Sequence, residues 1–160
     1  MNRQFTYRSG QVADTQRLAQ ALASRLSGGS VIVLDGDLGA GKTTFSKAFA
    51  AGMGVQEMVN SPTFTLIKEY EGAERPFYHM DVYRLSLEEA DELGLDEYFE
   101  SEGITLVEWG LLIEELLPET YLHIHIAQTD IHQRMFTLTP FGSPFDEICE
   151  ALTEAGVLNK

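Results

Sequence analysis

The stretch Ser-Val-Ile-Val-Leu-Asp-Gly-Asp-Leu-Gly-Ala-Gly-Lys-Thr-Thr, residues 30–44, decides the fold. Its first half, residues 30–35, is a nearly continuous run of aliphatic and β-branched residues. Such a run is typical of a strand buried on both faces of a parallel sheet. The second half, residues 36–43, has the spacing Gly, four residues, Gly-Lys-Thr that predicts a phosphate-binding loop. The residues that follow, through about Met53, predict a helix.

The residue types in this loop point to phosphate chemistry. Glycines let the backbone fold so that its N–H groups face phosphate oxygens. The following helix adds its unpaired N-terminal N–H groups and the positive end of its dipole. Lys42 would place a charge on the β and γ phosphates, and the Thr43 hydroxyl would coordinate Mg²⁺. We therefore expect a site for a nucleoside triphosphate with magnesium.

Strand-like and helix-like segments alternate along the whole chain, with no repeat and no linker. The pattern predicts helices over residues 11–27, 86–99, 111–117 and 144–156, and strands over 63–70, 76–81, 104–108, 121–127 and 135–139. Ser86 and Glu89 form a capping-box pattern at the start of the acidic second helix. We expect an α/β fold, with residues 1–160 forming a single-domain P-loop NTPase. Its central sheet should be mostly parallel, with helices on both faces and a C-terminal antiparallel hairpin.

Two carboxylates follow predicted strands and are candidates for the metal side of the site. Asp81 ends the strand over 76–81, and Glu108 ends the strand over 104–108. Ligands collect at the carboxyl ends of strands in open α/β sheets, and a phosphate-loop enzyme needs an acid there to hold Mg²⁺ or its water shell. We assign both residues catalytic and metal-binding roles. The sequence leaves open which one touches the metal and which acts through water.

Three further features lie near these elements in the sequence. Thr63 is the better candidate for a hydroxyl that senses the γ-phosphate, and Ser61 is the alternative. Trp109 directly follows Glu108 and is either a core anchor or a neighbour of the site. The histidines show no supporting cluster of carboxylates, so we interpret them as ordinary strand residues.

Composition narrows the class of protein. The formal net charge is −14, so the chain is not expected to hold nucleic acid by itself, because Lys and Arg contacts to phosphates dominate that affinity. The single cysteine, Cys149, excludes an internal disulfide and a multi-cysteine metal site. No apolar run is long enough for a membrane span, and the N-terminus lacks a signal-peptide core, so we expect a cytoplasmic protein. Between Arg84 and Arg134 lie thirteen Asp and Glu and no Lys or Arg, which indicates either a solvated acidic surface or a docking face for a basic partner.

The motifs that are present and those that are absent indicate which nucleotide is bound and which reaction is catalysed. No Asn-Lys-x-Asp motif for guanine is present, so ATP is favoured. A small-molecule kinase would normally close an Arg-bearing lid over the phosphates, and residues 85–133 offer no Arg for one. Arg84 is the first candidate for a cation near the site, and Arg134 is the second. A kinase and a nucleotide-dependent binding module remain the alternatives to an ATP hydrolase.

Taken together, four stretches make the chain resemble the bacterial TsaE (YjeE) family of small P-loop ATPases. They are Gly-Asp-Leu-Gly-Ala-Gly-Lys-Thr-Thr-Phe (36–45), Ser-Pro-Thr-Phe-Thr-Leu (61–66), His-Met-Asp-Val-Tyr-Arg-Leu (79–85) and Leu-Val-Glu-Trp (106–109). The resemblance implies an Mg²⁺-dependent ATPase, weak alone, that is required for threonylcarbamoyladenosine at position 37 of tRNA. It implies a TsaD–TsaB complex as the protein partner, with tRNA met only through that complex and no membrane contact. The oligomeric state stays open.

The resemblance also implies roles for individual residues. Nucleotide-binding positions fall on Thr15, on Asp37, Leu38, Gly39, Ala40, Gly41, Lys42, Thr43 and Thr44, and on Trp109. The metal-binding positions fall on Thr43 and Glu108, the Walker B aspartate on Asp81, and the switch hydroxyl region on residues 61–63. Family members often have proline after the Glu-Trp pair, whereas this chain has Gly110, so features that depend on the shape of that loop are not carried over.

Overall fold

The computed structural model describes residues 3–37, 39–60, 62 and 66–160. Its elements are, in chain order, β1 (Phe5–Ser9), α1 (Val12–Ala23), β2 (Val31–Gly36), α2 (Lys42–Gly52), β3 (Ile67–Glu71), β4 (Pro76–Asp81), α3 (Leu87–Asp91), α4 (Leu95–Phe99), β5 (Ile104–Glu108), the 3₁₀ helix η1 (Gly110–Leu116), β6 (Tyr121–Gln128), β7 (Arg134–Phe141) and α5 (Phe145–Glu154). Among these described helices, none combines the length and the hydropathy that a membrane crossing requires.

The strands form one sheet of seven in the order β1-β7-β6-β2-β5-β4-β3. The central pairs β6–β2, β2–β5 and β5–β4 are parallel, whereas β1–β7, β7–β6 and β4–β3 are antiparallel. The sheet is therefore mixed, and the prediction of a mostly parallel sheet was wrong. The short turns between β3 and β4 and between β6 and β7 force antiparallel pairing, because a parallel neighbour needs a long crossover. The α/β class and the C-terminal hairpin are confirmed.

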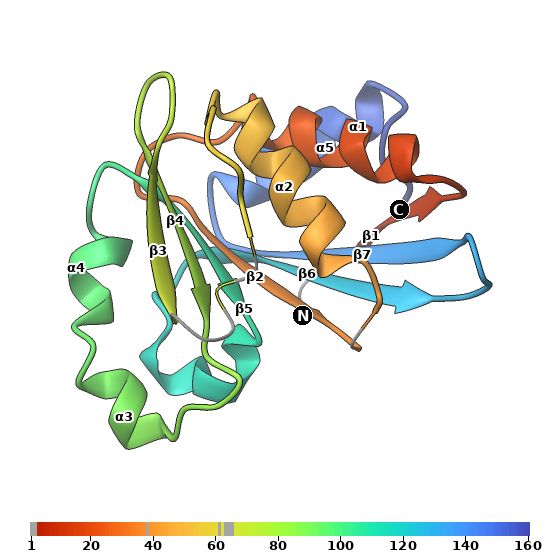
Figure 1. The fold of residues 1–160 in the computed structure, drawn as a ribbon. Helices are drawn as coiled ribbons and strands as arrows, with labels where there is room; N and C mark the ends of the chain where they lie inside the picture. The colour runs from red at the N-terminus through yellow and green to blue at the C-terminus, as the bar shows by residue number, and fades with distance from the viewer. Residues whose placement is uncertain (1–2, 38, 61, 63–65) are drawn as a thin grey trace.

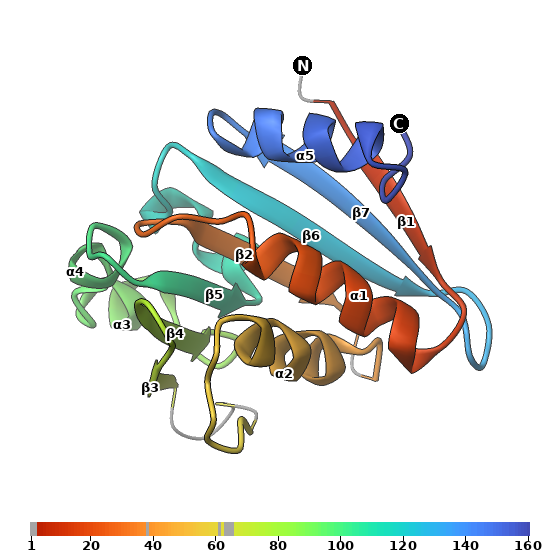
Figure 2. The same ribbon diagram turned by 90° about the horizontal axis from the view of Figure 1, so that it is seen from above.

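Helices cover the sheet on both faces. In Figure 1, α1, α2 and α5 lie above the sheet, whereas α4 lies at the left beside β3 and α3 lies at the lower left. Figure 2 shows α1 and α2 running side by side across the central strands. Each layer encloses its own cluster of buried apolar residues, one led by Phe45, Phe49 and Phe77 and the other by Val33, Met80 and Val107. The predicted covering of both faces is confirmed.

The central strand behaves as its sequence predicts. Val31, Ile32, Val33 and Leu34 of β2 are at most 1% exposed, because β2 is hydrogen-bonded on both edges and packed on both faces. On α2, Phe45 and Phe49 stand one turn apart and stack with ring centroids 6.1 Å apart. Phe49 also meets Phe77 of β4 at 5.7 Å. This aromatic contact fixes α2 over the neighbouring strand.

Several element boundaries differ from the sequence prediction. The strand expected over 63–70 begins only at Ile67, because Leu66 has a φ of 68° that strand geometry excludes; residues 63–65 lie outside the described residues. The helix expected over 86–99 is two short helices, since Gly94 adopts a left-handed φ of 68° between them. The predicted capping box of Ser86 and Glu89 is confirmed. Strand β1 was not predicted, and its pairing with β7 places residues 5–9 at one edge of the sheet.

We predict that Phe49→Ala lowers the free energy of unfolding by about 3–5 kcal/mol, because it removes a fully buried ring and leaves a cavity under α2. Lys47→Ala, at an exposed position of the same helix, should change it by less than about 0.5 kcal/mol. Urea unfolding of the two variants measures this difference. Equal midpoints would contradict the role given to the aromatic contact.

Candidate functional site

The loop between β2 and α2, residues 37–41, has the backbone that its glycines predict. Gly39 and Gly41 have φ values of 82° and 110°, which other residues rarely adopt. The N–H of Ala40 donates to the carbonyl of Asp37 at 2.9 Å and closes a tight turn. Gly36, where the loop begins, sits so close to β6 that a Cβ there would lie 2.7 Å from the Ile126 carbonyl oxygen. Leu38 lies outside the described residues.

Lys42 begins α2 and folds its side chain back over this loop. Its ammonium donates to the Gly36 carbonyl oxygen and to the Asp37 carbonyl oxygen, the second at 3.2 Å. The same Nζ lies 4.4 Å from the ring centroid of Trp109, a cation–π distance. Burial lowers the pKa of Lys42, and the nearby carboxylates, Glu108 first, act in the opposite direction. The cation is thus held at the loop by carbonyl dipoles, an aromatic face and surrounding negative charge.

Asp81 and Glu108 lie on neighbouring parallel strands and pair directly in register. Both are buried, 5% and 3% exposed, at the carboxyl ends of β4 and β5 beside the loop. The Oδ1 atom of Asp81 accepts the backbone N–H of Tyr83 at 2.9 Å, which orients its carboxylate. The structure therefore brings the two predicted carboxylates together.

His79 is a site residue that the sequence interpretation missed. Its Nε2 lies 2.6 Å from Oε2 of Glu108, and both side chains are buried. Its ring also stacks on Phe77, with centroids 5.8 Å apart. Within the described residues, its Nδ1 has no hydrogen-bond partner. The sequence did contain a signal for this role. His79 lies two residues before Asp81, and alternate residues of a strand face the same side of the sheet, so the two side chains share a face.

The donor set fits Mg²⁺, which prefers a small number of carboxylate oxygens together with phosphate and water oxygens. Asp81 and Glu108 supply carboxylates, and the exposed Thr43 supplies a hydroxyl in the first turn of α2. The described residues hold no group of three or more His, Cys, Asp and Glu that could bind a metal without such help. A metal here would thus depend on ligands from a bound nucleotide.

A pocket of about 400 Å³ adjoins the loop on the side of α1. Residues of three separate segments line it, among them Gln11, Thr15, Gly41, Thr44, Ile131 and Arg134. Thr15, which the sequence places far from the loop, therefore shares one pocket with Gly41 and Thr44. Four of the described residues predicted to bind the nucleotide, Thr15, Gly41, Thr44 and Arg134, therefore line this pocket.

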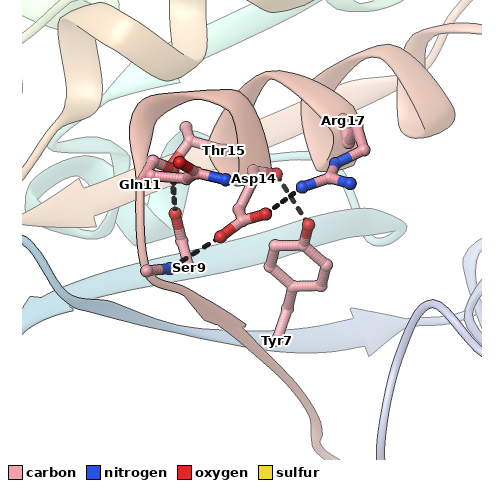
Figure 3. Close-up of polar contacts among 7 residues, drawn as sticks. Tyr7, Ser9, Gln11, Asp14, Thr15 and Arg17 are labelled. Atoms are coloured by element: carbon pink, nitrogen blue, oxygen red, sulfur yellow. Dashed lines mark hydrogen bonds and ion pairs between the residues drawn. The ribbon is translucent and has the colours of Figure 1, made fainter.

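The turn from β1 to α1, which forms one wall of this pocket, is fixed by polar contacts (Figure 3). The Ser9 hydroxyl donates to the Gln11 carbonyl oxygen at 2.9 Å and lies 2.8 Å from the Thr15 hydroxyl. Either hydroxyl can be the donor in the contact between Ser9 and Thr15. The N–H of Gly10 and the side chain of Arg17 both reach Asp14. These contacts hold Thr15 at the wall of the pocket.

Arg134, at the start of β7, reaches the phosphate loop. Its Nε donates to the Ala40 carbonyl oxygen at 2.9 Å. Its Nη1 lies 3.1–3.3 Å from the carbonyl oxygens of Asp130, Ile131 and Gln133 in the β6–β7 turn. The side chain therefore ties this turn to the loop, which places the second candidate cation at the site. Arg84 follows Tyr83 on the exposed surface beyond β4.

Trp109 links the loop to the protein surface. Its φ of 63° is left-handed, an uncommon conformation for a bulky residue, and its N–H donates to the Leu34 carbonyl oxygen at 2.9 Å. Its ring meets the Lys42 ammonium and also packs against Tyr83 with centroids 4.7 Å apart. The next residue, Gly110, lies so near β2 that a Cβ would be 2.7 Å from Val33 Cγ1.

The remaining predictions have mixed outcomes. Thr63 and Ser61, the two candidates for the switch hydroxyl, lie outside the described residues. His123 is a strand residue of β6, but its Nε2 also contacts Oδ2 of Asp35 at 2.9 Å. That contact lies just before the loop and was not predicted.

With this geometry established, comparisons with known proteins identify the relatives of the chain. The family model described as "Threonylcarbamoyl adenosine biosynthesis protein TsaE" matches residues 9–136. The chain belongs to the TsaE family. The TsaE protein of Bacillus subtilis (strain 168), named as a tRNA threonylcarbamoyladenosine biosynthesis protein, is 47% identical over 94% of this chain and 95% of its own length.

Other TsaE relatives and a solved structure agree with this assignment. The protein of the same name from Nostoc sp. is 38% identical over 84% of this chain and 85% of its own length. The crystal structure of YdiB from Bacillus subtilis superposes with a TM-score of 0.86 at 43% identity and covers 98% of both chains. The structural match thus agrees with the family assignment, and the resemblance noted from the four motifs is confirmed.

We predict that Arg134→Lys loosens the β6–β7 turn, because a lysine ammonium lacks the forked donors that contact Ala40 and the turn at once. Amide hydrogen exchange should speed up at Thr129 and Gln133, which bond within the turn. Arg8→Lys, at an exposed position of β1, is the matched control. Unchanged protection in the Arg134 variant would show that the side chain does not hold the turn.

Proposed function

We propose that the protein is an Mg²⁺-dependent ATP hydrolase that acts with a TsaD–TsaB complex in threonylcarbamoyladenosine modification of tRNA position 37. The observation that carries this proposal is the juxtaposition of Lys42, Asp81 and Glu108 around the loop between β2 and α2. A cation and two buried carboxylates beside a helix N-terminus suit a triphosphate with its metal. Membership of the TsaE family supports the pathway, and the partner follows from the family resemblance.

The loop and Lys42 would bind the phosphates and stabilise charge that develops during transfer to water. Backbone N–H groups of Gly39 and Gly41 and of the first turn of α2 are the donors in this proposal. Lys42 now donates to carbonyl oxygens of the loop, and a bound phosphate would offer it stronger, charged acceptors. Donors fixed before the reaction contribute most when charge appears in the transition state.

Magnesium would be held by the Thr43 hydroxyl and the carboxylate side of the site, and when bound it supplies positive charge to the β and γ phosphate oxygens. Either Asp81 or Glu108 can be the direct ligand, with the other acting through water or orienting the attacking water. The hydrogen bond from His79 occupies Oε2 of Glu108 and leaves Oε1 for that role. Residues that hydrogen-bond a metal ligand commonly fix its orientation in this way.

The pocket beside Thr15 would take the nucleoside. Its approximately 400 Å³ lie directly against Gly41 and Thr44. The Thr15 hydroxyl gives this pocket a polar group that could hydrogen-bond the nucleoside. The lack of an Asn-Lys-x-Asp motif for guanine supports ATP as the substrate. We place the protein in the cytoplasm, where such a tRNA enzyme would act.

We predict that Lys42→Ala and Glu108→Gln each lower phosphate release from Mg·ATP by roughly 100-fold or more, because each removes charge that acts in the transition state. Lys68→Ala, on β3, is the matched control and should retain wild-type turnover. Phosphate release, with and without a purified TsaD–TsaB pair, measures the effect. Phosphorylation of an added metabolite in place of free phosphate would favour a kinase. Normal tRNA modification over many turnovers by Lys42→Ala would favour a binding module.

We also predict that His79→Phe raises the Mg²⁺ concentration for half-maximal hydrolysis roughly tenfold, since Glu108 loses the donor that orients it. ATP affinity without metal should stay within about twofold, which separates this effect from general unfolding. His79→Gln retains an N–H donor at a similar reach and should recover most of the Mg²⁺ dependence. An unchanged Mg²⁺ requirement in His79→Phe would show that His79 does not orient Glu108 for metal binding.

A further inference from the structure

An exposed apolar strip lies beyond the carboxyl ends of β4 and β5, and we define it by Tyr83, Leu87, Leu111 and Leu112. These side chains are 53%, 39%, 39% and 54% exposed. Among the described residues, the other large exposed apolar side chains are Val12, Met58 and Ile131. Val12 and Ile131 line the pocket beside Thr15, so the strip is a separate concentration of apolar surface.

The strip is continuous with the phosphate loop through Trp109. Tyr83 packs on the Trp109 ring at 4.7 Å, and the same ring lies 4.4 Å from Nζ of Lys42. The backbone of Leu112 donates to the Trp109 carbonyl oxygen at 3.0 Å. Trp109 itself has the left-handed φ of 63° that a bulky residue adopts only when its surroundings enforce it. A change at the surface is therefore two side-chain contacts away from the loop cation.

The strip is surrounded by negative charge. Glu88 and Asp91 of α3, and Glu114 and Glu115 of η1, are exposed on the elements that carry it. From residue 85 to residue 133 the chain has thirteen Asp and Glu and no Lys or Arg. A second copy of this chain would bring the same acidic rim against itself and be repelled. The complementary surface is an apolar patch with a basic rim.

We infer that the strip is the docking surface for a protein partner with an apolar centre and a basic rim, and that docking acts on the loop through Tyr83, Trp109 and Lys42. This rests on the proposed function for the identity of the partner, the TsaD–TsaB complex. Contact with Tyr83 changes the packing of the Trp109 ring, and that ring is one of the groups that hold the Lys42 ammonium against the loop carbonyls. Partner binding and ATP turnover are coupled at this point.

The test measures binding of the purified TsaD–TsaB pair separately from hydrolysis. Leu112→Ser removes apolar surface and Glu115→Lys reverses a rim charge; each should weaken the affinity for the pair at least tenfold. Their matched controls are Met58→Ser, at an exposed apolar position outside the strip, and Glu154→Lys, at the end of α5 on the opposite face of the sheet. Both controls should bind within twofold of wild type. All four variants should hydrolyse ATP alone at the wild-type rate.

A second measurement tests the proposed chain of contacts from Tyr83 through Trp109 to Lys42. Trp109 is the only tryptophan of the chain, so biosynthetic 5-fluorotryptophan gives a single ¹⁹F signal from this protein in a complex. Addition of the pair should shift this signal in wild type, and the shift should be lost with Leu112→Ser at the same concentrations. A shift without stimulated phosphate release would overturn the coupling.

The outcomes separate this inference from the proposed function. If the strip variants bind the pair as tightly as their controls, or if wild type does not bind it, the docking inference is wrong. Concentration-dependent self-association that Leu112→Ser abolishes would identify a second copy as the occupant and would also overturn it. Equal phosphate release by wild type and Lys42→Ala would instead overturn the ATP hydrolase, and the binding data would still decide the docking surface.

Discussion

Parallel pairing of β2 with both β5 and β6 is the constraint on which the site depends. It aligns the carboxyl end of β2, where the loop begins, with the carboxyl end of β5, where Glu108 lies. The parallel pairing of β4 with β5 then adds Asp81 in the same register. A slip of one residue in either pairing would turn a carboxylate to the other face of the sheet. The mixed outer strands can vary in direction without disturbing this alignment.

The elements that surround the site are packed differently on the two faces of the sheet. On one face α2 is fixed by aromatic contacts to β4, so the first turn of the helix and the loop are held rigidly. On the other face the elements after β4 and β5 are short helices with exposed apolar and acidic side chains. Trp109 lies where the two meet. The protein therefore combines a loop and helix packed against the core with an exposed apolar and acidic surface on the other face.

Local chemistry determined which parts of this structure could be predicted from the sequence. Unambiguous sequence patterns mark the buried strand β2, the glycine loop and the ends of β4 and β5. These patterns were enough to predict Lys42, Asp81 and Glu108 as site residues. The direction of the outer strands could not be read from periodicity, because alternation is the same in parallel and antiparallel pairs. His79 was missed for a related reason, since its contact with Glu108 crosses two strands separated by 29 positions. Gly94 was the overlooked break between α3 and α4, and a single glycine within a polar helical pattern is a weak signal.

The contacts of Arg134 have a consequence for how this protein can vary. Among the described residues, the hydrogen-bond partners of its guanidinium are all backbone carbonyls, on Ala40 and in the turn that ends β6. Carbonyls are common to all residues, so the arginine recognises the path of the chain and not the side chains along it. The turn can therefore exchange its residues during evolution as long as its course is preserved, while the arginine itself has no equivalent replacement. The residue types of the turn are thus free to vary, whereas the path of its backbone and the arginine are not.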